Sequence, residues 1–590
     1  MSNIYGKYSY DTNKNILFKI VEKEKDGEIE EIFVPIYDGM IEIEETSIDL
    51  DEDKELILLK SFMNNNNSYK EISKGLMFGG SAKFAEELNN KRGFRIRPNS
   101  NIQKNLQEFL YEQYAGLEAD NKIMDVFYTN NMGFYENFSN GYNIKTFVYP
   151  NCDISIGDNV FYKREGKYNK VFKHKGSKEE WITNILTAAV LSDNMKIMIL
   201  GTFASILLEP LEVHENFIIE LSGTTGTSKT TALNVCASIF GKPSEYITDW
   251  NTTSTAVISK ASEINVFPLI LDDTKKCKEK EMIPGIVYSF SGGKDRARAN
   301  TDGSLQEQKT FKNIGLLTGE VPLADYLKGG ETGSGVFARF ISLDGGAFEK
   351  SENNKMIADQ LNADTKKYYG TIGYEFICWL NTVLEDEEEL DNLKEIYKTH
   401  IMANSAKVTK EISKRRANHI ALLQTTGYLL DKFLGTDYMG IENLINKLLI
   451  DTDQSVEDTD NVKNAYYAIM EYCNKNEKRF YRKGDEVEAI GSPLGQFKNN
   501  QYQFFSKDDI DKIISPFGDV TDIFRNFKER GYLIANNGQK RYSKNDRKIF
   551  GDKKSIKFYV IDKSFYDEDI KEGYDIREDL EPVQGNFDDI

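Results

Sequence analysis

Short apolar runs of two kinds open the chain and predict both strands and helices before residue 115. Two runs have the aromatic and β-branched character of strands, and two have the apolar spacing of helices. In chain order they cover residues 16–21, 31–36, 76–91 and 101–114. Residues 116–175 are short aromatic stretches broken by Asn, Gly and Asp, which favour strands and turns. We therefore predict an N-terminal α+β domain over 1–115 and a collar or linker over 116–175.

Near residue 176 the pattern changes to apolar helices that alternate with short apolar strands. The strand-like runs are 217–221, 266–273, 313–319 and 339–344. Strands that alternate with helices imply a largely parallel sheet with its loops at the carboxyl edge. Residues 356–440 have a helical pattern throughout. We therefore predict an α/β domain over 176–440 that ends in a helical lid.

The C-terminal part of the chain predicts a separate domain over 455–565 and an acidic tail over 566–590. Three helices, a strand, an Asn-Asn-Gly turn and a second strand follow one another, which is the order of a winged helix. Eleven Lys and Arg but only three acids fall between Arg525 and Lys557. This charge predicts DNA binding, with a helix in a major groove and the wing on phosphates, although the same fold also serves protein contacts. The candidate DNA-binding residues are Arg525, Lys528, Arg530, Lys540 and Arg541.

The composition limits the classes of protein to which the chain can belong. A chain of 590 residues is too long for one core and predicts roughly three or four domains. The net charge of −19 means that DNA contacts must come from local basic patches or from the lumen of an assembly.

Cysteine usage and hydropathy favour a cytoplasmic protein. Five scattered cysteines without a CxxC pair argue against a zinc site and predict reduced thiols. The start has no apolar signal-peptide core, and Asp193, Asn194 and Lys196 interrupt the most apolar stretch, 185–211. That stretch predicts a buried helix pair rather than a membrane span. We expect no membrane partner.

The most specific signal is a Gly/Thr-rich loop between a predicted strand and a predicted helix. Its candidate nucleotide-binding residues are Gly223, Thr224, Thr225, Gly226, Thr227, Ser228, Lys229, Thr230 and Thr231. Backbone N–H groups of such a loop cradle phosphates at a helix N-terminus. Lys229 would contact the β- and γ-phosphates, and the Thr230 hydroxyl would bind Mg²⁺. We predict ATP and Mg²⁺ as cofactors; a turn that caps an ordinary helix is the simpler alternative.

One residue of this loop departs from the usual pattern GxxxxGK[ST]. Ser228 occupies the second glycine position, where its Cβ would crowd the backbone's approach to phosphate. Gly226, two residues earlier, would relieve the crowding. We expect the change to affect turnover more than the fold.

Two further strand ends supply candidate catalytic groups. The strand 266–273 ends in Asp272, which would orient the Mg²⁺ shell, and in Asp273, which stands where a residue activates the attacking water. Glu is commoner at the second position, and Asp is shorter by one methylene. Thr318 ends the next strand where a γ-phosphate sensor would lie, and Glu320 follows without an assigned role. Capped strand ends are the alternative explanation.

Two segments carry arginines that would complete such a site. Arg339 precedes the last core strand, where ring-forming ATPases place an arginine that enters the neighbouring subunit's site. Capping of a helix or pairing with an acid is the alternative. The cluster Lys414-Arg415-Arg416 lies on the predicted helix 409–423. Such clusters are usually solvated helix faces, and this is the preferred explanation; a second sensor arginine within the cluster is the alternative.

Six sequence blocks together resemble one family. They are GTTGTSKTTAL, TDWNTTSTAV, FPLILDDT, IVYSFSGGKDRARANTDGS, LLTGEVPL and GVFARFISLD. In this order they are similar to the AAA+ ATPases of mobile genetic elements that look like MCM helicases. That family includes self-loading helicases and replication initiators of staphylococcal cassettes and pathogenicity islands. The resemblance implies an AAA+ core in a multidomain α/β chain, a homohexameric ring, ATP hydrolysis coupled to DNA unwinding, and 3′-to-5′ translocation on single-stranded DNA.

The resemblance also gives a role to a basic segment. Lys294, Arg296 and Arg298 lie where such motors insert a β-hairpin into the pore, so they would grip the backbone of single-stranded DNA. Without the resemblance, a solvated loop or a subunit contact explains them equally well. With its C-terminal domain on double-stranded origin DNA, the chain would be both initiator and motor. A primase or other replication proteins would be its partners.

Three other functions stay open. The chain could be an ATP-switched protein that marks or melts origin DNA without translocating, or a regulator whose ATPase is vestigial. The third is the helicase part of a helicase–primase. For that function the N-terminal part offers no convincing pair of metal-binding acids, since Asp49, Asp51 and Asp53 look too close together and too exposed.

Overall fold

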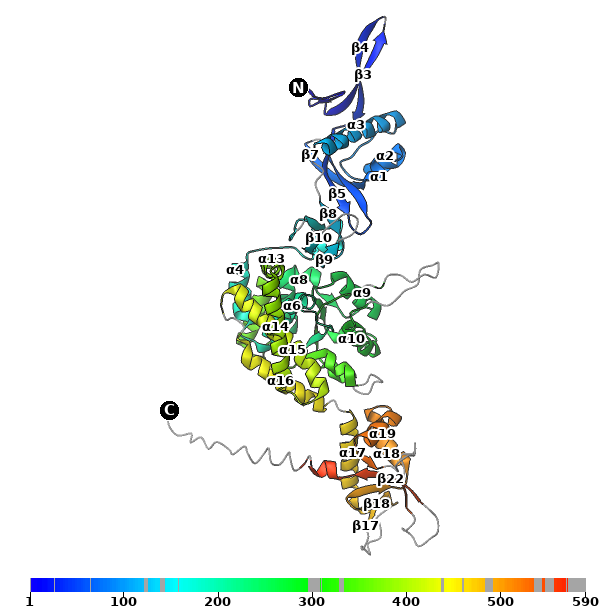
Figure 1. Ribbon diagram of the computed structural model, residues 1–590, viewed down its shortest axis with the longest axis vertical. Helices are drawn as coiled ribbons and strands as arrows, with labels where there is room; N and C mark the ends of the chain where they lie inside the picture. The colour runs from blue at the N-terminus through cyan, green and yellow to red at the C-terminus, as the bar shows by residue number, and fades with distance from the viewer. Residues whose placement is uncertain are drawn as a thin grey trace, which may run out of the picture.

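The computed structural model describes most of the chain, and Figure 1 shows its parts arranged along one long axis. The described residues are 2–25, 27–63, 65–120, 126–137, 144–157, 159–294, 308, 310–327, 334–436, 440–458, 461–482, 492–534, 544–546, 556–568 and 570. The N-terminal strands lie at one end, an α/β part with many helices lies in the middle, and a smaller α/β part lies at the other end.

An antiparallel meander and a second sheet build the N-terminal part. The meander has the order β1-β2-β3-β4, with bounds Ser2–Tyr5, Tyr8–Asp11, Ile16–Lys25 and Glu28–Tyr37. The next elements are β5 (Met40–Asp49), β6 (Lys54–Met63), β7 (Asn66–Ser73), α1 (Lys74–Met77), α2 (Ser81–Asn89) and α3 (Ser100–Ala119). Phe84 and Leu88 on α2 join Leu106 and Leu110 on α3 in one buried cluster. The apolar residues whose spacing predicted these helices are therefore the ones that the helices bury in this core.

The second sheet continues into residues of the predicted collar. β8 (Phe127–Thr129) and β11 (Val160–Tyr162) complete it in the order β11-β8-β5-β6-β7. β8 pairs in parallel with β5, and β11 pairs in parallel with β8. A hairpin of β9 (Gly133–Asn137) and β10 (Ile144–Val148) lies between them in the sequence. The N-terminal part and the collar therefore share one sheet.

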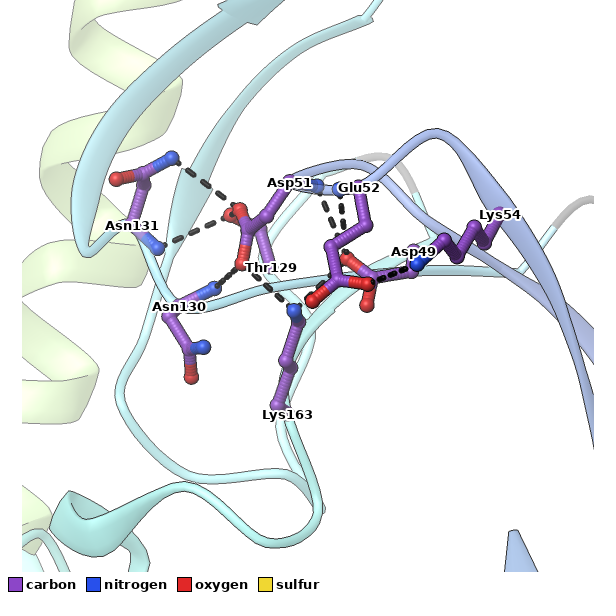
Figure 2. A network of polar contacts seen from close by, with 8 residues as sticks. All are labelled: Asp49, Asp51, Glu52, Lys54, Thr129, Asn130, Asn131 and Lys163. Carbon is purple, nitrogen blue, oxygen red and sulfur yellow. Dashed lines mark hydrogen bonds and ion pairs between the residues drawn. The ribbon is translucent and has the colours of Figure 1, made fainter. Parts of the chain in front are cut away.

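A polar network holds this joint together (Figure 2). Lys163 Nζ lies 2.8 Å from Asp49 Oδ1 and 2.8 Å from Asp51 Oδ2. Asp51 also accepts hydrogen bonds from Thr129 Oγ1 (2.5 Å) and from the backbone N–H of Asn130 (2.9 Å). Asp49 is only 7% exposed, so the expectation of a solvent-exposed acid is wrong for this residue. The positive charge of Lys163 offsets the negative charges of both carboxylates, and these contacts connect β5 to the collar strands.

A five-stranded parallel sheet forms the core of the middle part. In spatial order its strands are β13 (Thr248–Asp249), β14 (Leu269–Asp272), β15 (Gly315–Gly319), β12 (Ile218–Ser222) and β16 (Phe340–Leu343). All neighbouring pairs are parallel. β12 and β15 are buried along their whole length, as expected for a parallel sheet covered on both faces. The four strand-like runs and the parallel sheet predicted for this region are confirmed.

Helices connect and cover these strands. They are α4 (Lys178–Trp181), a π-helical turn (Ile182–Leu186), α5 (Thr187–Ala189), α6 (Asp193–Leu207), α7 (Lys229–Phe240), α8 (Pro243–Tyr246), α9 (Ser254–Ile264), α10 (Ile283–Ser291) and α11 (Leu323–Leu327). α6 lies in the most apolar stretch and is buried from Ile197 to Leu207. In the part of the chain that the structure describes, no helix has both the length and the apolar character needed to cross a membrane.

Longer helices follow the sheet. They are α12 (Glu352–Asp364), α13 (Thr371–Glu385), α14 (Glu387–Ser405), α15 (Glu411–Leu434) and α16 (Ile441–Asp458). The first four fall largely within the range 356–440 that was predicted to be a helical lid, and the fifth lies beyond it. α15 packs against α14 and α6. His419 of α15 stacks on Phe217, just before β12, with ring centroids 4.3 Å apart. The lid therefore contacts the start of the central strand directly.

The last part has a hydrophobic core of its own. Its elements are α17 (Asn461–Lys475), β17 (Phe480–Arg482), β18 (Gly495–Lys498), β19 (Gln501–Phe504), α18 (Lys507–Ile514), α19 (Val520–Glu529), β20 (Leu533–Ile534), β21 (Lys544–Asp546) and β22 (Ile556–Asp562). The sheet has the order β17-β18-β19-β22-β20, with β21 against β22. Ile523, Phe524 and Phe527 on α19 are buried, as their spacing predicts.

Candidate active site

The Gly/Thr-rich loop joins the end of β12 to the start of α7, in the predicted strand–loop–helix context. Its shape depends on glycine at the first position, since a Cβ on Gly223 would lie 2.7 Å from the backbone nitrogen of Gly346. Inside the loop, Thr227 Oγ1 donates a hydrogen bond of 2.8 Å to the Thr224 carbonyl oxygen. The loop is therefore closely packed.

Ser228 has a left-handed backbone, with φ 59° and ψ 30°. A residue with a Cβ pays about 1 kcal/mol or more for this conformation, whereas glycine does not. As N-terminal cap of α7 it also makes no side-chain capping bond. The sequence suggested that the Cβ would crowd an approaching phosphate; the structure adds a cost in the backbone itself.

The Lys229 side chain folds back over the loop. Its Nζ donates hydrogen bonds to the carbonyl oxygens of Gly223 (2.6 Å) and Thr224 (3.1 Å). Partial burial lowers the pKa of Lys229, and the charges of Glu320, Asp273 and Asp272 partly offset that effect. An ammonium held by two carbonyl oxygens can transfer these bonds to phosphate oxygens without a change of charge.

Three oxygen-bearing side chains meet beside the lysine. Thr318 Oγ1 on β15 donates to Asp272 Oδ1 on β14 (2.8 Å), and Thr230 Oγ1 on α7 lies 3.4 Å from the same oxygen. Thr318 Oγ1 also accepts from the backbone N–H of Asp273 (3.0 Å). A hydroxyl and a carboxylate are the hard oxygen ligands that Mg²⁺ takes beside substrate phosphates. The donor set of Thr230 and Asp272 therefore fits Mg²⁺.

One carboxylate oxygen of Asp273 is bonded to the turn that follows β14. Its Oδ1 accepts from the backbone N–H of Lys275 (3.1 Å) and so caps the 3₁₀ turn Thr274–Lys276. The backbone of Asp273 is left-handed, with φ 62°. Its role as the group that activates water stays a prediction, because one carboxylate oxygen already serves this turn.

Glu320 is the residue of this site that the sequence left without a role. It accepts a short hydrogen bond from Thr225 Oγ1 in the loop and one from Lys275 Nζ (2.8 Å). The Lys275 bond, and then the Thr225 bond, lower the pKa of Glu320 to about 2. The only signal in the sequence was an acid two residues beyond a sensor-like threonine.

The two arginines near the last core strand lie apart from the loop. Arg339 Nη1 donates to the Gly335 carbonyl oxygen, and its guanidinium carbon lies 4.2 Å from the ring centroid of Tyr288 on α10. Arg416 is 4% exposed, so a solvated helix face is wrong for it. Its Nε donates to the Phe337 carbonyl oxygen (2.7 Å), and burial lowers its pKa to about 10.

The candidate DNA contacts are only partly within the described residues. Arg296, Arg298, Lys540 and Arg541 lie outside them. Lys294 forms an isolated antiparallel bridge with Thr310, at the base of the basic segment. Arg525, Lys528 and Arg530 are exposed at α19 and just beyond it. Arg525 pairs with Asp522 at 2.9 Å, so part of the positive charge on this helix face is offset.

We also searched the described residues for a metal site. Across the described residues, no group of three or more His, Cys, Asp and Glu is arranged to hold a metal ion. Cys236, Cys277 and Cys473 are buried, and Cys152 and Cys378 are partly exposed.

Comparison with known proteins gives a family match and matches to solved structures, one of which is described here. No curated protein matches the chain. The solved structure described as "SCCmec type IV Cch - active helicase" matches with a TM-score of 0.66 at 14% sequence identity. The match covers 96% of this chain and 99% of that chain. At this identity the likeness shows that the two chains share a fold over nearly their full lengths.

The family match rests on the sequence itself. The sequence model of the family described as "Domain of unknown function (DUF927)" matches residues 8–310. This range begins in the N-terminal meander and ends after β14 and the basic segment, so it includes the Gly/Thr-rich loop. Because it covers more than half of the 590 residues, the chain belongs to the DUF927 family.

Proposed function

We propose that the chain is an ATP-hydrolysing motor that unwinds DNA and initiates replication of a mobile genetic element. The observation that carries the proposal is the meeting of Lys229, Thr230, Asp272 and Thr318 at the carboxyl ends of three adjacent parallel strands. A phosphate loop beside a carboxylate and a polar sensor is the arrangement that nucleotide hydrolysis requires. The fold shared with a structure described as an active helicase supports the same function.

The motor proposal extends to a ring of identical subunits. We infer an AAA+ core in which ATP and Mg²⁺ bind between subunits and Arg339 enters the neighbour's site. Single-stranded DNA would thread through the centre, with 3′-to-5′ polarity taken from the resemblance alone. Lys294, Arg296 and Arg298 would contact its backbone. The contacts of Arg339 with Gly335 and Tyr288 hold the guanidinium at a defined place on the subunit surface, which supports a role toward a neighbour.

Origin recognition is assigned to the C-terminal part. The buried face of α19 packs on the core of this part, and the opposite face exposes Arg525 and Lys528. We propose that α19 is the recognition helix of a winged helix and that Arg530, Lys540 and Arg541 extend the contact to phosphates. Because these contacts join Lys and Arg side chains to phosphates, such binding should weaken steeply as salt rises.

The test is ATP turnover with and without single-stranded DNA, in the wild type, Lys229→Ala and Arg339→Ala. Both variants should lose DNA-stimulated turnover. Mixing the two variants should restore part of it, because a mixed ring contains sites with an intact lysine facing an intact arginine. Turnover of the wild type no higher than that of Lys229→Ala would exclude a motor.

A second candidate function is an ATP-switched protein that marks or melts origin DNA without translocating. The capping bond of Asp273 and the left-handed Ser228 favour it, because both oppose rapid hydrolysis. Replacing Lys294, Arg296 and Arg298 together by Ala separates the two functions. A translocating motor should then lose strand displacement but keep origin binding, whereas a switch protein should lose neither origin binding nor origin melting.

A further inference from the structure

Glu320 connects the phosphate loop to the segment that follows β14. Its two carboxylate oxygens have different partners: Thr225 Oγ1 donates to one, and Lys275 Nζ donates to the other at 2.8 Å. Thr225 lies in the middle of the loop, and Lys275 lies in the turn after Asp273. A single carboxylate therefore bridges the Gly/Thr-rich loop to the turn that follows β14.

The position of this carboxylate conflicts with that of a triphosphate. Of the three carboxylates whose charge favours the Lys229 ammonium, Glu320 acts most strongly. Lys229 in turn marks the place of the β- and γ-phosphates. A fixed negative charge beside that place attracts the lysine but repels a phosphate. The repulsion is largest for the terminal phosphate of a triphosphate, which brings the most negative charge.

The other two acids are held by other contacts. Asp272 accepts from Thr318 (2.8 Å), and Asp273 caps the turn at Lys275 (3.1 Å). Of these three acids, only Glu320 accepts a hydrogen bond from a side chain of the loop between Gly223 and Ser228 among the described residues. The Lys275 bond remains available when the Thr225 bond breaks, so the carboxylate has a second partner to keep.

We propose that Glu320 is a latch that sets the selectivity of the site between nucleoside diphosphate and triphosphate. It holds the Thr225 side chain and opposes the γ-phosphate by its charge. When a triphosphate binds, it leaves Thr225 and stays with Lys275. The latch rests on the proposed function, since it requires that the loop binds nucleotide. It makes triphosphate binding conditional on release of the Thr225 side chain from Glu320.

The test is the ratio of two dissociation constants, for ADP and for a non-hydrolysable ATP analogue, measured without hydrolysis. Glu320→Gln should tighten binding of the ATP analogue by about five- to tenfold and binding of ADP by less than about twofold. Thr225→Val removes the hydrogen bond but keeps the charge. It should tighten binding of both nucleotides alike and leave their ratio at the wild-type value.

A matched control uses Glu245, which lies in α8 and pairs with Lys242 at 3.2 Å. Glu245→Gln should leave both constants at wild-type values. An unchanged ratio in Glu320→Gln, or weaker binding of the ATP analogue, would overturn the latch.

Lys229→Ala separates failure of the latch from failure of the nucleotide site. If Lys229→Ala abolishes binding while Glu320→Gln leaves the ratio unchanged, the latch is wrong and the nucleotide site stands. If the wild type binds neither nucleotide, or binds no better than Lys229→Ala, both proposals fall.

Discussion

The Nε of Arg416 donates a hydrogen bond of 2.7 Å to the carbonyl oxygen of Phe337, and this bond ties the lid to the turn that carries Arg339. Arg416 lies on α15, whereas Phe337 lies in the 3₁₀ turn Ser334–Arg339. Because the guanidinium is buried, the bond is shielded from water and strong. Any movement of α15 therefore moves the turn that ends in Arg339.

Replacing Arg416 by Met should uncouple this turn from the lid. Methionine keeps much of the side-chain volume but leaves the Phe337 carbonyl oxygen without its donor, so Arg339 loses its fixed position. We expect unchanged nucleotide affinity and a DNA-stimulated kcat lower by roughly tenfold, because misplacement of a catalytic group costs rate rather than binding. Arg415→Met changes the exposed neighbour on the same helix and should leave kcat as it is. Equal effects of the two changes would contradict the coupling.

Replacing Ser228 by Gly should stabilise the middle part of the chain. The change removes the cost of a left-handed residue with a Cβ, worth about 1 kcal/mol, at a position without a capping bond. The three tryptophans, Trp181, Trp250 and Trp379, all lie in this part, so urea unfolding followed by tryptophan fluorescence reports it. Ser351→Gly is the matched control, because Ser351 also caps a helix but has φ −150° and accepts a bond from Asn354 N. It should cost a few tenths of a kcal/mol, roughly; the same sign at both positions would refute the explanation.

Glu220 should make stability depend on pH. It is buried on β12, where it accepts from Leu323 N (2.6 Å) and from Ser342 Oγ (2.8 Å), and burial raises its pKa from 4.5 to about 7. The folded state therefore holds the proton more tightly than the unfolded state. This contribution is complete below pH 4.5 and is lost as pH rises through about 7, a change of about 3 kcal/mol.

The measurement is the free energy of unfolding from pH 5 to pH 8, in the wild type and in Glu220→Gln. Glutamine can accept from Leu323 N but does not titrate. The difference between the two proteins should therefore grow in favour of the variant as pH rises. Parallel pH profiles would show that Glu220 does not titrate in this range.

Replacing Lys163 by Met should weaken the joint between the N-terminal part and the collar. The change leaves the buried Asp49 and its neighbour Asp51 without their shared cation, which costs about 2 kcal/mol after allowance for the partly exposed lysine. Hydrogen exchange of the backbone amides in β5 and β8 should become faster. Lys54→Met is the control in the same network (Figure 2), because the Lys54–Glu52 pair is more than half exposed on both sides. Exchange in that variant should match the wild type.

How much the sequence could predict depended on whether the signal was local. The strands β12, β14, β15 and β16 have continuous apolar runs, and each predicted run is a strand. The pairing of β5 with β8 joins residues far apart in the sequence, and no local pattern marks it. Burial of Asp49 follows from that pairing, so it could not be predicted from the local sequence either.

In the candidate site, too, the residues with a local sequence signal were predicted and those without one were not. Lys229, Thr230 and Asp272 were predicted from a motif whose spacing reflects its chemistry, and the structure places Thr230 and Asp272 beside each other. Glu320 received no role because its partners, Thr225 and Lys275, come from two other strand ends. Arg416 resembled a surface charge because its neighbours in sequence are Lys and Arg, whereas its burial depends on the turn at Phe337.

The sheet that the N-terminal part shares with the collar has a consequence during synthesis of the chain on the ribosome. β5 ends at Asp49, but β8, which pairs with its open edge at Ile48 and Asp49, ends at Thr129. Translation at about 5–20 residues per second leaves that edge uncovered for on the order of ten seconds. An uncovered edge invites pairing with other nascent chains, and charged side chains discourage it. Glu42, Glu44 and Glu45 lie in β5, so the strand carries its own protection against aggregation until its partners have been made.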